Sequence, residues 1–283
     1  MSLKRVIKEF YKEKQLCEGF DPEGNPDLKY YAFDWDDNIM IMPTQLIVST
    51  DEGKEIGMST EDFANYRGVL GKEPFEYKGE NIIGYASDSY RNFGVKGDKS
   101  FIIDSLIAKP GPSWDDFVEA INGGSIFSII TARGHTPSVL RDAIYNMIVT
   151  DHNGISKESL IQNLKKYRDM DGNEESDTSI MINDYLDLNK YYPVTYGEGE
   201  ASNPEEGKVK ALREFITYVR EMSKRIGKNA FLKNDIKNNF IPTIGFSDDD
   251  PGNVETIKSF LDKEYKDKPV KTYLTKGGDK IEV

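Results

Sequence analysis

The sequence of 283 residues predicts an α/β fold built on a mostly parallel β-sheet. Short apolar runs rich in β-branched and aromatic residues alternate with helical patterns, as in βαβ units. The chain is long enough for one large domain or for a core domain that carries an insertion. Three of the apolar runs end on polar residues, and an open parallel sheet carries its ligand site at this end of its strands.

The first segments predict a helix, a strand and a hairpin. An amphipathic pattern indicates a helix over 4–16, and the apolar run over 29–34 indicates a buried strand. The segment 44–59 predicts two strands that are joined by the turn at 51–53.

The following segments predict two helices and a second buried strand. The first helix begins near residue 60 behind a Ser-Thr cap, and residues 71–110 then show no clear period. The second helix is capped by Ser113 and ends at the glycine pair 123–124. The short apolar run over 125–130 is β-branched, which favours a buried strand.

The second half continues the alternation of helices and strands. The polar stretches 171–179 and 197–207 are expected to be loops. The predicted elements are helices over 137–149, 156–170, 208–226 and 251–265 and strands over 191–196, 240–247 and 270–275.

Composition narrows the class of protein. Lys and Arg number 37 and Asp and Glu 49, which gives a formal net charge of −12 and argues against a protein that coats nucleic acid. Cys17 is the single cysteine, so no internal disulfide is possible and we expect a cytoplasmic protein. We find no apolar run of about 18 residues and no apolar core of a secretory signal, and we expect no membrane span.

The first strand ends on a close pair of carboxylates. Asp34 and Asp36 are two residues apart, and on a continuing strand they would point the same way and repel each other unless a cation relieves them. A solvated turn is the plain alternative. However, Thr131 and the acidic run 248–250 also follow apolar strands, and Lys208 opens a predicted helix. Four such features in this order favour one shared site.

These features resemble the motifs of the haloacid dehalogenase (HAD) superfamily of phosphohydrolases. The stretch "AFDWDDNIM" is similar to the first motif, an apolar strand followed by D-x-D, with Asn38 where Thr or Val is usual. "SIFSIITARG" offers Thr131 for the second motif. "PEEGKVKALREF" offers Lys208 for the third, with Lys210 as a second choice. The resemblance spans residues 29–260.

The fourth motif is an apolar strand that ends in an acidic cluster. "IPTIGFSDDDPGN" resembles its D-D-x-P-x-N version and places Asp249 at the metal-ligand position, with Asp248 before it and Asn253 near its close. The resemblance implies a Rossmann-like three-layer core over 1–41 and 113–283 and a small C1-type cap inserted over 42–112.

The resemblance also implies an activity, that of a Mg²⁺-dependent phosphatase that acts on a small phosphate monoester through an aspartyl-phosphate. Asp34 is the expected nucleophile, and Asp36 is the expected acid and base. Thr131 and Lys208 are expected to hold the transferring phosphoryl group. The expected metal ligands are Asp34, Asp36 (through its backbone carbonyl), Asp248 and Asp249.

Other residues near these motifs permit two interpretations each. Arg133 could clamp a substrate phosphate, or it could pair with a nearby acidic residue. His135 is expected at the start of a helix rather than in catalysis. Tyr85, Tyr90 and Phe93 could stack on a substrate, or they could pack inside the cap.

The same residues suggest three alternative functions. A calcium-binding EF-hand loop starting at Asp34 fails, because its sixth and twelfth positions are Ile39 and Gln45 rather than Gly and Glu. A metal-dependent D-x-D glycosyltransferase explains the first carboxylates but calls for neither Thr131 nor Lys208. A non-catalytic binding protein with a HAD-like fold would be expected to have broken motifs, whereas these look intact.

Overall fold

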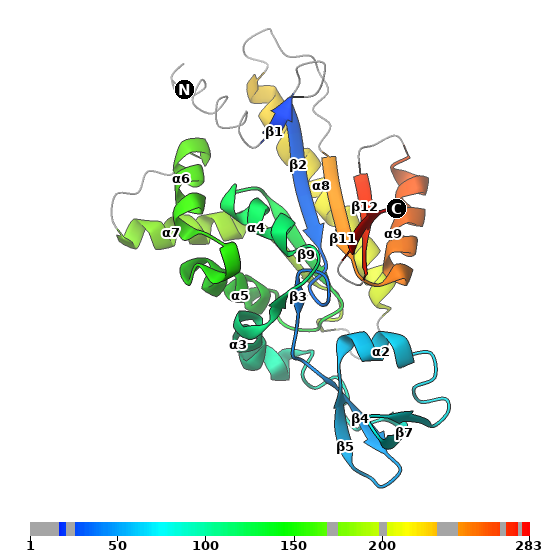
Figure 1. Ribbon diagram of the computed structural model, residues 1–283. Coiled ribbons are helices and arrows are strands. Elements are labelled where there is room, and N and C mark those ends of the chain that lie inside the picture. The colour runs from blue at the N-terminus through cyan, green and yellow to red at the C-terminus, as the bar shows by residue number, and fades with distance from the viewer. Residues whose placement is uncertain are drawn as a thin grey trace.

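The computed structural model describes residues 17–20, 26–168, 175–197, 203–230, 243–266, 270–276 and 279–283 (Figure 1). The helix expected over 4–16 lies outside the described residues. In the described part, the fold is mixed α/β with a mainly parallel sheet, as the alternation predicted. No helix in these ranges is long and apolar enough to cross a membrane.

The main sheet has seven strands. Its parallel strands are, in spatial order, β10 (Lys190–Pro193), β9 (Phe127–Thr131), β2 (Pro26–Phe33), β11 (Thr243–Asp248) and β12 (Val270–Lys276). Two antiparallel strands complete it, β1 (Cys17–Phe20) along β2 and β13 (Asp279–Glu282) along β12. The chain adds β9 on one side of β2 and β11 on the other, so the carboxyl ends of these three strands lie side by side.

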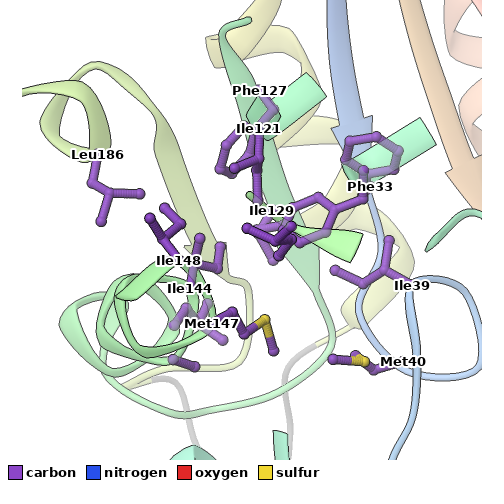
Figure 2. Close-up of a cluster of buried hydrophobic side chains, with 14 of the residues drawn as sticks. Phe33, Ile39, Met40, Ile121, Phe127, Ile129, Ile144, Met147, Ile148 and Leu186 are labelled. Carbon is purple, nitrogen blue, oxygen red and sulfur yellow. The ribbon is translucent and has the colours of Figure 1, made fainter. Parts of the chain in front are cut away.

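Helices cover both faces of this sheet. Alternate side chains of each strand point to opposite faces, so each strand contributes to a core on either side. Tyr30 and Ala32 pack in one core with α8 (Pro204–Ala230) and α9 (Pro251–Glu264). Phe33 packs in the other core, which also contains Phe127 and Ile129 of β9 (Figure 2). The helices of this second core are α3 (Asp98–Ile107), α4 (Trp114–Asn122), α5 (Pro137–Val149), α6 (Lys157–Arg168) and α7 (Glu175–Leu188).

Two expected loops are partly helical. The prediction of a loop over 171–179 is wrong from Glu175 onward, because α7 begins there and buries apolar residues at helical spacing in its later turns. The loop predicted over 197–207 gives way to α8 at Pro204. Asn203 Oδ1 accepts hydrogen bonds from the next two backbone N–H groups, and proline suits the first helical position. Lys208 therefore lies in the second turn of α8.

A smaller antiparallel sheet forms within residues 46–85. Its spatial order is β5 (Glu55–Met58), β4 (Leu46–Thr50), β7 (Glu80–Tyr85) and β6 (Phe75–Tyr77). β4 and β5 confirm the predicted hairpin, and Gly53 supplies the positive φ of 77° that its turn needs. Ser59 accepts a hydrogen bond from the Asp62 backbone N–H and caps α2 (Thr60–Tyr66), as expected. This unit has its own core, centred on Leu46, Val48 and Ile82.

The chain leaves the main sheet and returns to it at one place. β3 (Met40–Ile41) and β8 (Lys109–Pro110) pair antiparallel and close the segment between them. The stretch 71–110 had no readable period because it changes conformation every few residues, through β6, β7, the 3₁₀ turn η1 (Val95–Gly97) and α3. A second 3₁₀ turn, η2 (His152–Gly154), follows α5.

Candidate active site

Asp34 is the first residue after β2, and its carboxylate lies beside a buried lysine. Lys208 Nζ donates to Asp34 Oδ1 at 2.9 Å and to Asp248 Oδ2 at 2.6 Å. Burial alone lowers the pKa of Lys208, but Asp248 and Asp34 raise it above its usual value overall. The lysine is therefore a fixed positive charge between the ends of β2 and β11.

Asp248 holds this lysine in place. Its Oδ1 atom accepts hydrogen bonds from the Asp250 backbone N–H and from Asn253 Nδ2, both at 3.0 Å, while its Oδ2 atom accepts from Lys208. Three donors thus occupy the two oxygens of a fully buried carboxylate. The sequence placed Asn253 near the close of the fourth motif, and this contact gives the residue a structural role.

Asp249 completes a cluster of three carboxylates. One ligand atom each of Asp34, Asp248 and Asp249 lies within 4.8 Å of the other two. Burial raises the pKa of Asp34 to about 8 and that of Asp249 to about 9, although Lys208 acts in the opposite direction on both. The lysine therefore does not neutralise the cluster. Carboxylate oxygens are the ligands that Mg²⁺ prefers, so the donor set fits this ion.

Asp36 has a different cationic partner. β2 ends at Phe33, and the Asp36 carboxylate accepts two hydrogen bonds from Arg133, with Nε–Oδ2 at 2.7 Å and Nη2–Oδ1 at 2.6 Å. Its side chain thus stays outside the carboxylate cluster, unlike that of Asp34. The predicted role of its backbone carbonyl as a metal ligand stays a prediction, as does the predicted role of Arg133 as a substrate clamp.

Thr131 is the last residue of β9 and is 1% exposed. Its Oγ1 atom accepts a hydrogen bond from the Arg133 backbone N–H at 3.3 Å. The end of β9 lies beside that of β2, so Thr131 borders the same cavity as Asp34, Asp36 and Lys208. The four residues predicted to be catalytic therefore come together around one cavity.

Asn38 explains how the loop after β2 is fixed. Its Nδ2 atom donates to the Asp34 carbonyl at 3.0 Å and to the carbonyl and hydroxyl oxygens of Ser247 at 3.0 and 2.9 Å. Its Oδ1 atom accepts from Thr275 Oγ1 at 3.0 Å. A Thr or Val at this position could not make all of these contacts. Asp37 turns the loop with a φ of 53°, and burial raises its pKa to about 6.

The cavity has a volume of about 620 Å³, which is far more than a phosphoryl group needs. Its polar end holds the strand termini. Its opposite wall comes from the segment between β3 and β8 and includes Leu46, Phe63, Tyr90 and Phe93. Tyr85 stacks on Tyr90 with ring centroids 6.1 Å apart but does not border the cavity.

One ion pair joins α2 to the fourth motif beside the cavity. Arg67 follows α2 and pairs with Asp250 through both of its terminal nitrogens, with Nη2–Oδ1 at 3.2 Å. Asp250 also caps α9 by accepting from the Gly252 backbone N–H. These contacts lower the pKa of Asp250 overall, although burial raises it.

The sequence pointed to Tyr90 and Phe93, which border the cavity, but it missed other residues that the segment between β3 and β8 brings to this cavity. Phe63, Arg67 and Asp88 border it, and no local pattern marks them as site residues. The nearest signal in the sequence is the helix predicted from about residue 60, which carries Phe63 and is followed by Arg67. Asp88 has no comparable signal. Lys210, the second choice for the third motif, lies elsewhere: it borders a separate hollow of about 500 Å³ with Tyr192.

Comparison of the chain with protein-family models, curated proteins and solved structures finds no match.

Proposed function

We propose that this protein is a Mg²⁺-dependent phosphohydrolase of the HAD-like type that acts on a small phosphate monoester. The arrangement that carries the proposal is the Asp34 carboxylate, held 2.9 Å from buried Lys208 and next to Asp249, at the end of the central strand. A carboxylate attacks an anionic phosphate ester only where positive charge offsets the repulsion.

The reaction proceeds in two covalent steps. An Asp34 oxygen attacks phosphorus, the bond from phosphorus to the ester oxygen breaks, and Asp36 gives a proton to the leaving oxygen. In the second step Asp36 takes a proton from water, the water oxygen attacks phosphorus, and the acyl-phosphate bond breaks to free phosphate and Asp34. Thr131 and Lys208 bind the phosphoryl oxygens in both steps.

A divalent cation would be held by Asp34 and Asp249, with Asp248 and the Asp36 backbone carbonyl as further predicted ligands. When bound, it neutralises the charge that develops on the phosphoryl oxygens. The three-carboxylate cluster and the raised pKa values of Asp34 and Asp249 support this assignment.

We further propose the finer description of the fold, a Rossmann-like three-layer core over 1–41 and 113–283 with a C1-type cap over 42–112. Two observations support it. Helices lie on both faces of the parallel sheet, and the segment between β3 and β8 has its own small sheet and core. The wall that this segment adds to the cavity would set which ester binds.

A panel of phosphate esters tests the proposal, assayed with Mg²⁺ and with EDTA. We expect Mg²⁺-dependent release of phosphate from 4-nitrophenyl phosphate and a transient mass increase of one phosphoryl group on the protein. Release of a sugar from a nucleotide sugar would instead indicate a metal-dependent glycosyltransferase. No turnover of any ester, with ligand binding intact, would indicate a non-catalytic binding protein and refute the proposal.

A further inference from the structure

Arg133 is buried in the middle of a contact network, with 1% of its surface exposed. Each of its three guanidinium nitrogens has a partner. They bind both oxygens of Asp36, Thr44 Oγ1 at 3.0 Å from Nη2, and His135 Nε2 at 3.1 Å from Nη1. The rings of Phe93 and Phe101 lie 4.9 Å from its central carbon.

His135 extends the network by one more residue. Arg133 Nη1 can only donate, so His135 Nε2 accepts and the ring proton resides on Nδ1. That Nδ1 atom lies 2.8 Å from Asp98 Oδ1 and donates to it. Burial and the neighbouring guanidinium lower the pKa of His135, which agrees with a neutral ring. The ring is fully buried and does not border the cavity.

The network joins the main sheet to the segment between β3 and β8. Arg133 and His135 follow β9, whereas Thr44, Phe93 and Asp98 belong to the other segment. A second contact lies beside it, where the Gly134 backbone N–H donates to the Phe93 carbonyl at 2.8 Å. The Arg133 guanidinium is thus held both by residues that follow β9 and by residues of the segment between β3 and β8.

A guanidinium fixed in this way leaves little freedom to the carboxylate that it binds. The two parallel hydrogen bonds define the plane and position of the Asp36 carboxylate, which otherwise sits on a loop after the strand. Four of the five N–H donors of Arg133 are occupied by its contacts, so a substrate phosphate could take the two parallel donors only by displacing Asp36, its single carboxylate partner at hydrogen-bond distance in the described part of the chain.

We propose that Arg133 is a positioning residue for Asp36 rather than a ligand of the substrate phosphate. His135, with Asp98 behind it, holds the guanidinium. This proposal rests on the proposed phosphohydrolase function, because it names the residue that positions Asp36, the acid and base of that reaction. It also makes the segment between β3 and β8 part of the catalytic machinery, because Thr44 and Phe93 fix the same guanidinium.

The role predicts a dependence on the leaving group. Proton transfer by a positioned side chain contributes about 10²–10⁴-fold to rate, and an alkoxide needs that proton far more than a nitrophenolate does. Misplacing Asp36 therefore lowers kcat/KM, which reports the step that expels the leaving group, far more for an alkyl phosphate than for an aryl phosphate. Loss of the base in the second step slows hydrolysis of the phosphoenzyme equally for both esters. A lost phosphate ligand would instead raise KM for both esters alike.

The experiment compares kcat and KM on 4-nitrophenyl phosphate and glycerol 2-phosphate, both with Mg²⁺. The variants are Arg133→Lys, Asp36→Asn and their double mutant. His135→Phe is a milder variant, since the aromatic ring stays beside Phe101 while the acceptor for Nη1 is lost. Arg141→Gln is the matched control, because Arg141 pairs with Asp187 away from the cavity (Nε–Oδ1 2.9 Å).

We expect Arg133→Lys to lower kcat/KM on the alkyl ester by about 10-fold or more relative to the aryl ester, within the range for proton transfer, and His135→Phe to act in the same direction more weakly. The double mutant should be no worse than Asp36→Asn alone, because the two residues act as one unit. Equal losses of kcat/KM on both esters, or additive effects in the double mutant, would overturn the role of Arg133. Wild-type protein that hydrolyses neither ester would overturn the proposed function and this role with it.

Discussion

Replacement of Asp249 by Asn should make the metal-free protein more stable. Asp249 lies in the cluster with Asp34 and Asp248, and burial raises its pKa to about 9. Folding without a cation therefore either brings ionised carboxylates close together or requires one of them to bind a proton, and both cost free energy. Asparagine has nearly the same shape as aspartate and carries no charge, so Asp249→Asn removes this cost.

The size of the effect follows from the geometry. Two full charges at the 4.8 Å limit of the cluster repel each other by about 3.5 kcal/mol at an effective dielectric constant of about 20. Lys208 and bound protons offset part of this, so we expect a net gain of about 2 kcal/mol in the free energy of unfolding. For a chain of this size, that gain corresponds to a rise of about 4 °C in Tm.

The assay is thermal unfolding of both proteins in EDTA and in millimolar Mg²⁺. Wild-type protein should gain Tm on adding Mg²⁺, because a ligand that binds only the folded state stabilises it, whereas Asp249→Asn should gain little. Asp184→Asn, at an exposed position on α7, is the control for the substitution itself. A variant that is less stable than wild type in EDTA, or that keeps the full Mg²⁺ shift, would refute this reasoning.

Three further predictions follow from the same contacts. Asp34→Asn should abolish turnover of aryl and alkyl esters while the fold survives. Asp36→Asn should keep some aryl turnover, limited by the second step, and lose alkyl turnover. Steady-state kinetics check both variants, and the reverse pattern would mean that the two roles are exchanged. In EDTA, the Tm of wild-type protein relative to that of Asp249→Asn should fall as pH rises from about 4 to about 9, because the folded pKa of Asp249 lies above its unfolded value and stability is lost as its proton leaves. The comparison cancels the opposite contribution of His135, whose pKa burial lowers; a relative Tm that rises over this window contradicts the prediction. Arg67→Gln should lower the free energy of unfolding by less than about 1 kcal/mol, since its ion pair with Asp250 is partly exposed. It should raise KM more than it lowers kcat, because α2 beside the cavity is less firmly held. An unchanged KM would count against that role.

The sequence was sufficient to locate the five parallel strands of the main sheet, because their signals are local. An apolar run that stops at Asp34 or Thr131 marks a strand and its polar terminus within a few residues. The parallel arrangement then brings these termini to one edge of the sheet, so separate motifs could be predicted to meet. The hairpin over 44–59 was equally local, since its turn and its alternation lie within one segment.

The partners of these residues could not be predicted, because they depend on how distant segments pack. Arg133 binds Asp36 from 97 residues away, and Asp250 binds Arg67 from 183 residues away. No periodicity encodes either distance. The helix α7 was missed for a different reason: the sequence of its first turn, Glu-Ser-Asp-Thr, is polar and favours a loop, and the apolar residues at helical spacing come only later, from Ile180 and Met181 on.

The way in which the carboxylates are paired supports the proposed cation. The predicted site residues include four carboxylates, Asp34, Asp36, Asp248 and Asp249, and two cationic side chains, Lys208 and Arg133. Arg133 offsets one negative charge and Lys208 another, which leaves a formal charge of −2 when all are ionised. Because Asp248 is saturated by hydrogen bonds and Asp36 by Arg133, the excess falls on Asp34 and Asp249. One divalent cation balances that charge at the place where a phosphoryl group would bind.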